Sequence, residues 1–73
     1  MPAKPQYRRT LGGRIRAYRN KADLTIEKLA EKADLHPNFI GEVERGNYDI
    51  SVGSLIKIAK ALGVRLRDLV ADL

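Results

Sequence analysis

Residues 24–46 read LTIEKLAEKADLHPNFIGEVERG, and this stretch decides the fold. It opens with a helix-start signal, because the hydroxyl of Thr25 can accept a hydrogen bond from the first backbone N–H groups of a helix. The apolar residues that follow recur at helical spacing and give one inward side: Leu29, Ala30 and Ala33. Asp34 comes next, and Asp is one of the few residues other than Gly that tolerate a left-handed turn. We therefore expect a short helix over about 26–32 that ends in a sharp turn.

A second short helix is predicted directly after the turn. Pro37 suits the first position of a helix, and Gly46 suits its end. Ile40 and Val43 form the inward side, and the other side is polar or small: Asn38, Gly41, Glu42 and Arg45. Two short helices joined by a tight turn meet the requirements of a helix-turn-helix, whose second helix enters a major groove about 12 Å wide. An ordinary helical hairpin has the same spacing, so both interpretations stay open at this point.

Helical patterns continue on both sides of this stretch. Apolar residues three and four positions apart predict a first helix over about 9–21, with Leu11, Ile15 and Tyr18 in its stripe. Ser51 can cap a fourth helix that Gly63 ends, and a last short helix follows. No segment alternates as a strand would. We predict an all-α domain of five helices over 9–73, preceded by a flexible basic arm over 1–8.

Charge is distributed unevenly along the chain. The formal net charge is +5 and the isoelectric point is about 9.9. The segment 1–21 holds seven basic residues and no acidic one. Such a distribution indicates a polyanionic partner, although a solvated surface explains the charge as well. The chain has no Cys, its first ten residues lack the apolar run of a secretory signal, and no apolar run could span a bilayer. We therefore expect a cytoplasmic protein with no membrane contact.

The sequence offers little for catalysis or metal binding. Ser51 and Ser54 have no His or other base at a suitable spacing, and no Gly-rich phosphate loop is present. His36 is the only His, so it cannot build a metal site on its own. We predict that the protein is not an enzyme and that it holds no cofactor or metal.

Several separated motifs together resemble one known family. They are Leu-Thr at 24–25, Leu-Ala at 29–30, Val-Glu-Arg-Gly at 43–46, and Leu-Ile-Lys-Ile-Ala-Lys-Ala-Leu-Gly-Val at 55–64. In order and spacing they resemble the Cro/cI (XRE) repressor family over about 11–69. The segment 40–46 is also similar to small controller proteins of restriction–modification systems. The resemblance implies a five-helix lambda-repressor-like fold with the helix-turn-helix at helices two and three. It also implies a homodimeric transcriptional regulator, a repressor or controller, on a two-fold symmetric site in double-stranded DNA.

The resemblance also assigns DNA contacts. Toward base edges it places five residues: His36, Pro37, Asn38, Gly41 and Glu42. Asn38 can pair with adenine and Glu42 can accept from the amino group of cytosine, although Glu42 can equally be a solvent-facing charge. Toward the DNA backbone it places another five: Thr25, Ile26, Arg45, Asn47 and Tyr48. Ile26 stands where the family usually has Gln, so the phosphate contact there must come from Thr25 or from backbone N–H groups.

Three further assignments complete the expectation. The family holds Arg19 and Glu44 as a partly buried ion pair that ties the first helix to the third. The basic arm, with Lys4, Arg8 and Arg9, either follows the minor groove or stays free. The last helix supplies more apolar surface than its own packing requires, and we expect a dimer face there, with simple core packing as the alternative: Val64, Leu66, Leu69 and Leu73.

An alternative function uses the same fold. An antitoxin, or another protein-interaction module, can have this architecture and bind a protein partner instead of DNA as its main target.

Overall fold

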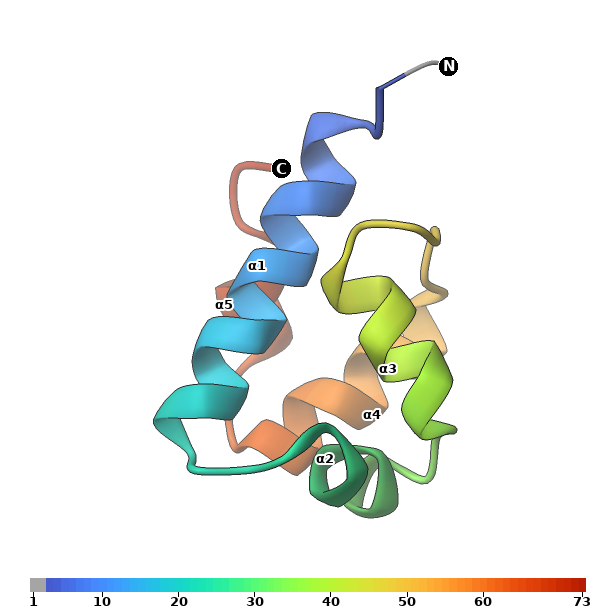
Figure 1. Ribbon diagram of the computed structural model, residues 1–73. Coiled ribbons are helices and arrows are strands. Elements are labelled where there is room, and N and C mark those ends of the chain that lie inside the picture. Colours follow the sequence, from blue (N-terminus) through green and yellow to red (C-terminus); the bar gives the residue numbers. More distant parts are fainter. Residues whose placement is uncertain (1–2) are drawn as a thin grey trace.

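The computed structural model describes residues 3–73, and within them the chain forms five helices and no strand (Figure 1). The helices are α1 (Gln6–Lys21), α2 (Ile26–Ala33), α3 (Pro37–Glu44), α4 (Val52–Leu62) and α5 (Leu66–Val70). The prediction of an all-α, five-helix fold is confirmed. Met1 and Pro2 of the predicted arm lie outside the described residues.

Helix α1 begins three residues earlier than the sequence predicted, at Gln6 instead of Arg9. Pro5 is its N-cap, with extended backbone angles, and the carbonyl of Pro5 accepts from the backbone N–H of Arg8 at 3.1 Å. The first turn is stabilised by the Arg8 side chain, which pairs with Asp49, 41 residues away. Residues 6–8 are therefore helical, and the arm is shorter than expected.

The caps that the sequence indicated are present. The hydroxyls of Thr25 and Ser51 accept from the backbone N–H of the third residue of α2 and α4, each at 3.0–3.1 Å. Asp34 (φ 55°) and Gly63 (φ 71°) end α2 and α4 in the left-handed region. His36 is the N-cap of α3, and its ring nitrogen Nδ1 accepts from the N–H of Asn38. Each cap satisfies backbone groups that a helix end leaves unpaired.

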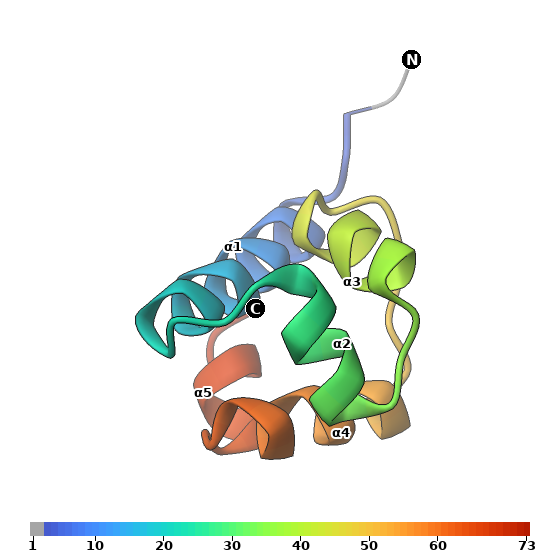
Figure 2. The same ribbon diagram turned by 60° about the horizontal axis from the view of Figure 1, so that its bottom comes forward.

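The core lies where the helices converge, with α2 packed on α3 and α4, and α1 packed on α3, α4 and α5 (Figure 2). Its most enclosed large side chains come from all five helices: Ile15, Leu29, Ile40, Val43, Ile58 and Leu69. Burying each of them stabilises the fold by about 1.5–3 kcal/mol. Within residues 3–73, no helix is long and apolar enough to cross a bilayer.

The burial of Leu69 contradicts one prediction. This residue was expected on a dimer face, but its exposure is 0% because α5 packs it against α1 and α4. Of the three other residues of that predicted face, Val64 and Leu66 are half-buried and pack against the core, while Leu73 is 44% exposed. Core packing therefore accounts fully for Leu69 and partly for Val64 and Leu66, and it leaves Leu73 exposed.

Helices α1 and α3 approach closely at Gly12. A Cβ atom at Gly12 would overlap the backbone carbonyl groups of Val43 and Glu44 at the end of α3. Gly12 costs helix propensity inside α1, but it allows the backbone of α3 to lie directly against α1. This contact fixes where α3 ends relative to α1.

Candidate nucleic-acid interface

The turn between α2 and α3 has the geometry that a helix-turn-helix requires. Asp34 adopts the left-handed conformation at the end of α2, and the N–H of Leu35 donates to the carbonyl of Ala30 at 2.9 Å. Ala30 is 1% exposed, and its small side chain lets the two helices cross closely. Pro37 then starts α3 at once. The two helices are thus held as one unit, with one side of α3 open to solvent.

The exposed side of α3 contains most of the predicted base-contacting residues. His36 and Asn38 are exposed, while Pro37 and Glu42 are half-buried. Gly41 is different, because it is buried. The guanidinium of Arg45 covers it, and a Cβ at Gly41 would lie 3.4 Å from Arg45 Nη1. The expectation that Gly41 lies on the open face is therefore wrong for this conformation.

Glu42 is the centre of a polar cluster at the end of α3. Its carboxylate accepts from Asn47 Nδ2 at 2.5 Å and from Arg45 Nη2 at 2.6 Å. These bonds, first that of Asn47 and then that of Arg45, lower the pKa of Glu42 below its ordinary value. Glu42 is thus ionised at neutral pH, and its charge is balanced by Arg45. Its remaining lone pairs can still accept a hydrogen bond from a base.

The start of α1 and the segment before it are tied to the loop that follows α3. Lys4 Nζ donates to the carbonyl of Arg45 at 2.8 Å. Arg8 forms two hydrogen bonds with the carboxylate of Asp49, at 2.9 and 3.0 Å, and the Tyr7 hydroxyl donates to the same carboxylate at 2.5 Å. The Arg8 contact, followed by that of Tyr7, lowers the pKa of Asp49 to about 2.

The predicted arm is consequently not free along its length. Arg8 lies in α1 and pairs with Asp49, and Arg9 lies in α1 and donates to Gln6 Oε1 at 2.6 Å. Of the three basic residues assigned to the arm, only Lys4 precedes the helix, and its ammonium group caps the end of α3. Sequence reasoning missed the contacts of Lys4 and Arg8 because their partners, Arg45 and Asp49, are distant in the chain.

A small basic cavity lies between α1, α3 and the start of α2. It has a volume of about 210 Å³ and is lined by Arg16, Arg19, Ile26, Gly41, Glu44 and Arg45. The side chain of Ile26 has no polar atom, so at this position of α2 only the backbone N–H groups can bind an anion. Arg16, which the site prediction did not include, is exposed at this position. The sequence feature that could have identified Arg16 is its position outside the apolar stripe of α1.

Arg19 and Glu44 close the inner end of this cavity. Arg19 Nε donates to Glu44 Oε2 at 2.7 Å, and Nη2 donates to Oε1 at 3.0 Å. Arg19 Nη1 also donates to the carbonyl of Leu24, at 2.9 Å, in the connection to α2. The side chains are 11% and 5% exposed, and the contact with Glu44 raises the pKa of Arg19. One arginine therefore holds α1, the start of α2 and the end of α3 together.

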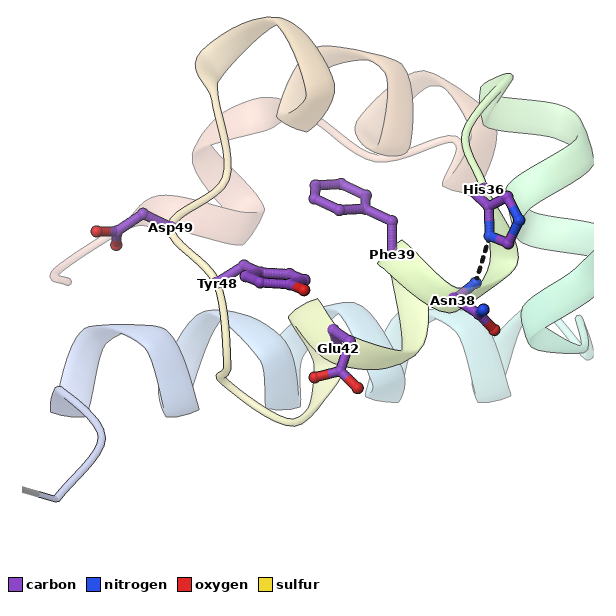
Figure 3. Close-up of a pocket in the computed structure, with 6 residues that line it drawn as sticks. All are labelled: His36, Asn38, Phe39, Glu42, Tyr48 and Asp49. Carbon is purple, nitrogen blue, oxygen red and sulfur yellow. Dashed lines mark hydrogen bonds between the residues drawn. The ribbon is translucent and has the colours of Figure 1, made fainter. Parts of the chain in front are cut away.

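An open groove of about 440 Å³ lies beside α3 (Figure 3). Phe39 projects from α3 toward Tyr48 of the following loop, and the two rings stack with centroids 6.0 Å apart and planes 17° from parallel. The other lining residues are polar: His36, Asn38, Glu42 and Asp49. The site prediction did not include Phe39. Its apolar side chain, between polar positions of the second helix of the motif, was the signal that could have identified it.

Other apolar side chains are exposed away from α3. Val52 is 63% exposed and Ile56 is 40% exposed, and they lie one turn apart on α4. Together with Leu73 they are the largest exposed aliphatic side chains in the described part of the chain. They give the molecule apolar surface that its own core does not use.

Comparison with known proteins gives consistent matches. The model of a helix-turn-helix family matches residues 15–69. The control protein C.BamHI of Bacillus amyloliquefaciens is 42% identical over 59 residues, which is 80% of this chain and 73% of that protein. The immunity repressor protein of Bacillus phage phi105 is 38% identical over 63 residues, 86% of this chain but only 44% of that repressor. The crystal structure of the restriction–modification controller protein C.AhdI from Aeromonas hydrophila superimposes with a TM-score of 0.84 at 34% identity, covering 85% of this chain and 94% of that one.

Proposed function

The chain belongs to the helix-turn-helix family, in its Cro/cI (XRE) branch of DNA-binding transcriptional regulators, and from this premise we propose that it binds a two-fold symmetric operator as a homodimer. In this role it acts as a repressor or as a controller of neighbouring genes. The observation that carries the proposal is the open side of α3, which presents His36, Asn38 and Glu42 directly after the Asp34 turn.

Base reading is proposed for this open side. The amide of Asn38 is exposed, and it can form two hydrogen bonds with an adenine in the major groove. Glu42 can accept from a cytosine amino group, because Arg45 balances its charge near the phosphates. Pro37 and His36 lie at the start of α3, where a helix entering the groove comes nearest to the bases. Gly41 contributes by leaving room for Arg45.

Contacts to the DNA backbone are proposed at the ends of the motif. Thr25 and the backbone of Ile26 bind one phosphate at the start of α2, with Arg16 beside them in the basic cavity. Arg45, Asn47 and Tyr48 bind the backbone on the other side of α3. These groups position the protein but do not read the sequence.

For the dimer we propose the apolar surface near the C-terminal end of the fold, where Leu73 is exposed and Val64 and Leu66 are half-buried. The aliphatic pair on α4, Val52 and Ile56, is a second surface of the same chemistry. Sedimentation of Leu73→Asp and Ile56→Asp variants separates the two, because both side chains are exposed in the monomer, and a charge in an apolar interface dissociates the dimer while a charge on free surface does not.

A selection from a random duplex pool tests the function as a whole. The expected result is enrichment of an inverted repeat whose half-sites lie about 10 bp apart from centre to centre. An Asn38→Ala variant should then relax the selected sequence at one position in each half-site, at a cost of about 1–3 kcal/mol. Recovery of unrelated sequences, bound only through salt-sensitive contacts, would contradict the proposal.

A further inference from the structure

The Phe39–Tyr48 groove is more apolar than backbone binding requires. A side chain that only donates to a phosphate needs a hydroxyl, whereas here the exposed ring of Tyr48 stacks on the ring of Phe39, which is half-buried. Tyr48 is 50% exposed, so a large part of its ring has no protein partner. A surface of this kind gains free energy when an apolar group covers it.

The groove lies next to the residues proposed to read bases. Asn38 and Glu42 are on its rim, one turn apart on α3, and Phe39 follows Asn38 directly. A base edge that hydrogen-bonds with Asn38 or Glu42 therefore brings its neighbouring atoms over the rings. In the major groove, base edges carry hydrogen-bonding groups and only one projecting apolar group, the methyl on C5 of thymine. A methylated cytosine carries the same group at the same place.

The loop that carries Tyr48 is held in position before any ligand binds. The next residue, Asp49, accepts hydrogen bonds from both Tyr7 and Arg8 of α1. On its other side, Asn47 donates to Glu42 of α3. Because both neighbours of Tyr48 are tied to helices, little conformational freedom is lost when the ring makes a contact.

We infer that the groove formed by Phe39 and Tyr48 receives the 5-methyl group of a pyrimidine in duplex DNA, an inference that rests on the proposed function. The rings provide an apolar surface for the methyl group, while Asn38 or Glu42 bonds to the polar edge of the same base or its neighbour. The protein thereby selects a position of its operator by an apolar contact in addition to hydrogen bonds.

The test replaces single methyl groups in the operator obtained by selection. Each thymine is exchanged in turn for deoxyuridine, which lacks only the methyl, and each cytosine is exchanged for 5-methylcytosine. If thymine is the ligand, each half-site has one sensitive position. Deoxyuridine at that position in one half-site weakens binding by about fourfold, the value for one buried methyl group. If 5-methylcytosine is the ligand, methylation at one position strengthens binding by a similar factor.

Variants of the full chain connect the effect to the groove. The methyl effect is the ratio of the affinities for operators with and without the methyl group. Tyr48→Ser should bring this ratio close to one, and Phe39→Leu should reduce it. Tyr48→Phe should preserve it, because the ring remains and only the hydroxyl is lost. Glu31→Ala removes an exposed side chain of α2 outside the groove and should leave the effect unchanged. Thermal melts establish that each variant is folded.

The outcomes separate the inference from the function on which it rests. Sequence-specific binding with no methyl effect at any position, or with an effect that Tyr48→Ser leaves intact, overturns the inference and leaves the regulator proposal standing. Equal binding to all duplexes overturns both.

Discussion

Arg19 is the residue on which the arrangement of α1, α2 and α3 depends most. Its guanidinium forms three hydrogen bonds, two with Glu44 and one with the carbonyl of Leu24, and little of the pair is exposed. Removing one partner of such a pair leaves a charge without compensation in a place with little water. The pair therefore contributes to positioning α3 as well as to stability.

We expect Glu44→Ala to destabilise the fold by about 3–5 kcal/mol, because Arg19 keeps its charge and loses its carboxylate. For a chain of this size the melting temperature should fall by well over 10 °C, since about 1 kcal/mol corresponds to 4–8 °C. Calorimetry or circular dichroism gives the value. Glu31→Ala is the control, because Glu31 is an exposed residue whose contact with Lys28 is 3.6 Å long. An unchanged melt in Glu44→Ala would remove the structural role assigned to the pair.

Asp49 makes stability depend on pH in the acid range. Its pKa is lowered to about 2 in the folded protein, mainly by Arg8, from an ordinary value near 3.9. Its stabilising contribution is therefore complete above pH 4 and is lost as pH falls toward 2. In Asp49→Asn that contribution is absent at every pH. The melting temperature of the variant should fall less steeply between pH 4 and pH 2 than that of the parent, and parallel curves would show that the contact does not form.

At the scale of the helices, two adjacent glycines in α1 have opposite roles. A Cβ at Gly12 would overlap the backbone of α3, whereas a Cβ at Gly13 has nothing within 4 Å. Gly13→Ala should stabilise the protein by about 0.5–1 kcal/mol through helix propensity alone. Gly12→Ala should destabilise it by about 1–3 kcal/mol, because α1 and α3 must move apart. Paired denaturation curves test both values, and equal effects of the two changes would show that the close approach does not exist.

The helix boundaries show which information is local. Thr25, Asp34, Ser51 and Gly63 mark helix ends through chemistry with their near neighbours, and the structure has those ends where the sequence predicted them. The start of α1 could not be predicted in this way, because it depends on the distant residue Asp49.

The candidate site shows the same distinction. The exposure of Asn38 follows from helical spacing, but the burial of Gly41 depends on where the side chain of Arg45 lies. The role of Phe39 became visible only with the position of Tyr48, which comes from a loop without regular spacing. Leu69 was misassigned because an apolar stripe does not tell which neighbouring helix covers it.

For the whole molecule, the excess of positive charge predicts how binding responds to salt. Each phosphate that the protein neutralises contributes about −0.9 to the slope of log affinity against log salt concentration. Arg16→Ala removes one proposed phosphate contact from each subunit, so the slope should become shallower by about one for each subunit bound. The change should weaken binding to all sequences alike. Arg67→Ala, with the same change of charge on α5, should leave the slope nearly unchanged. Equal shifts in the two variants would indicate a general field instead of a phosphate contact at the basic cavity.

The hydrogen bonds between the start of α1 and the loop after α3 affect how the native protein opens locally. Lys4, Tyr7 and Arg8 bond across 41 or 42 residues to Arg45 and Asp49, and all of these contacts are at the surface. Backbone amides in both segments should therefore exchange with deuterium through one shared local opening, while the amides of Ile40 and Ile58, which are fully enclosed, wait for global unfolding. Breaking the Asp49 contact should speed exchange at residues 8–9 and at residue 47 together. The first turn of α1 and the loop after α3 would then be a single dynamic unit, built from two segments 41 or 42 residues apart in the sequence.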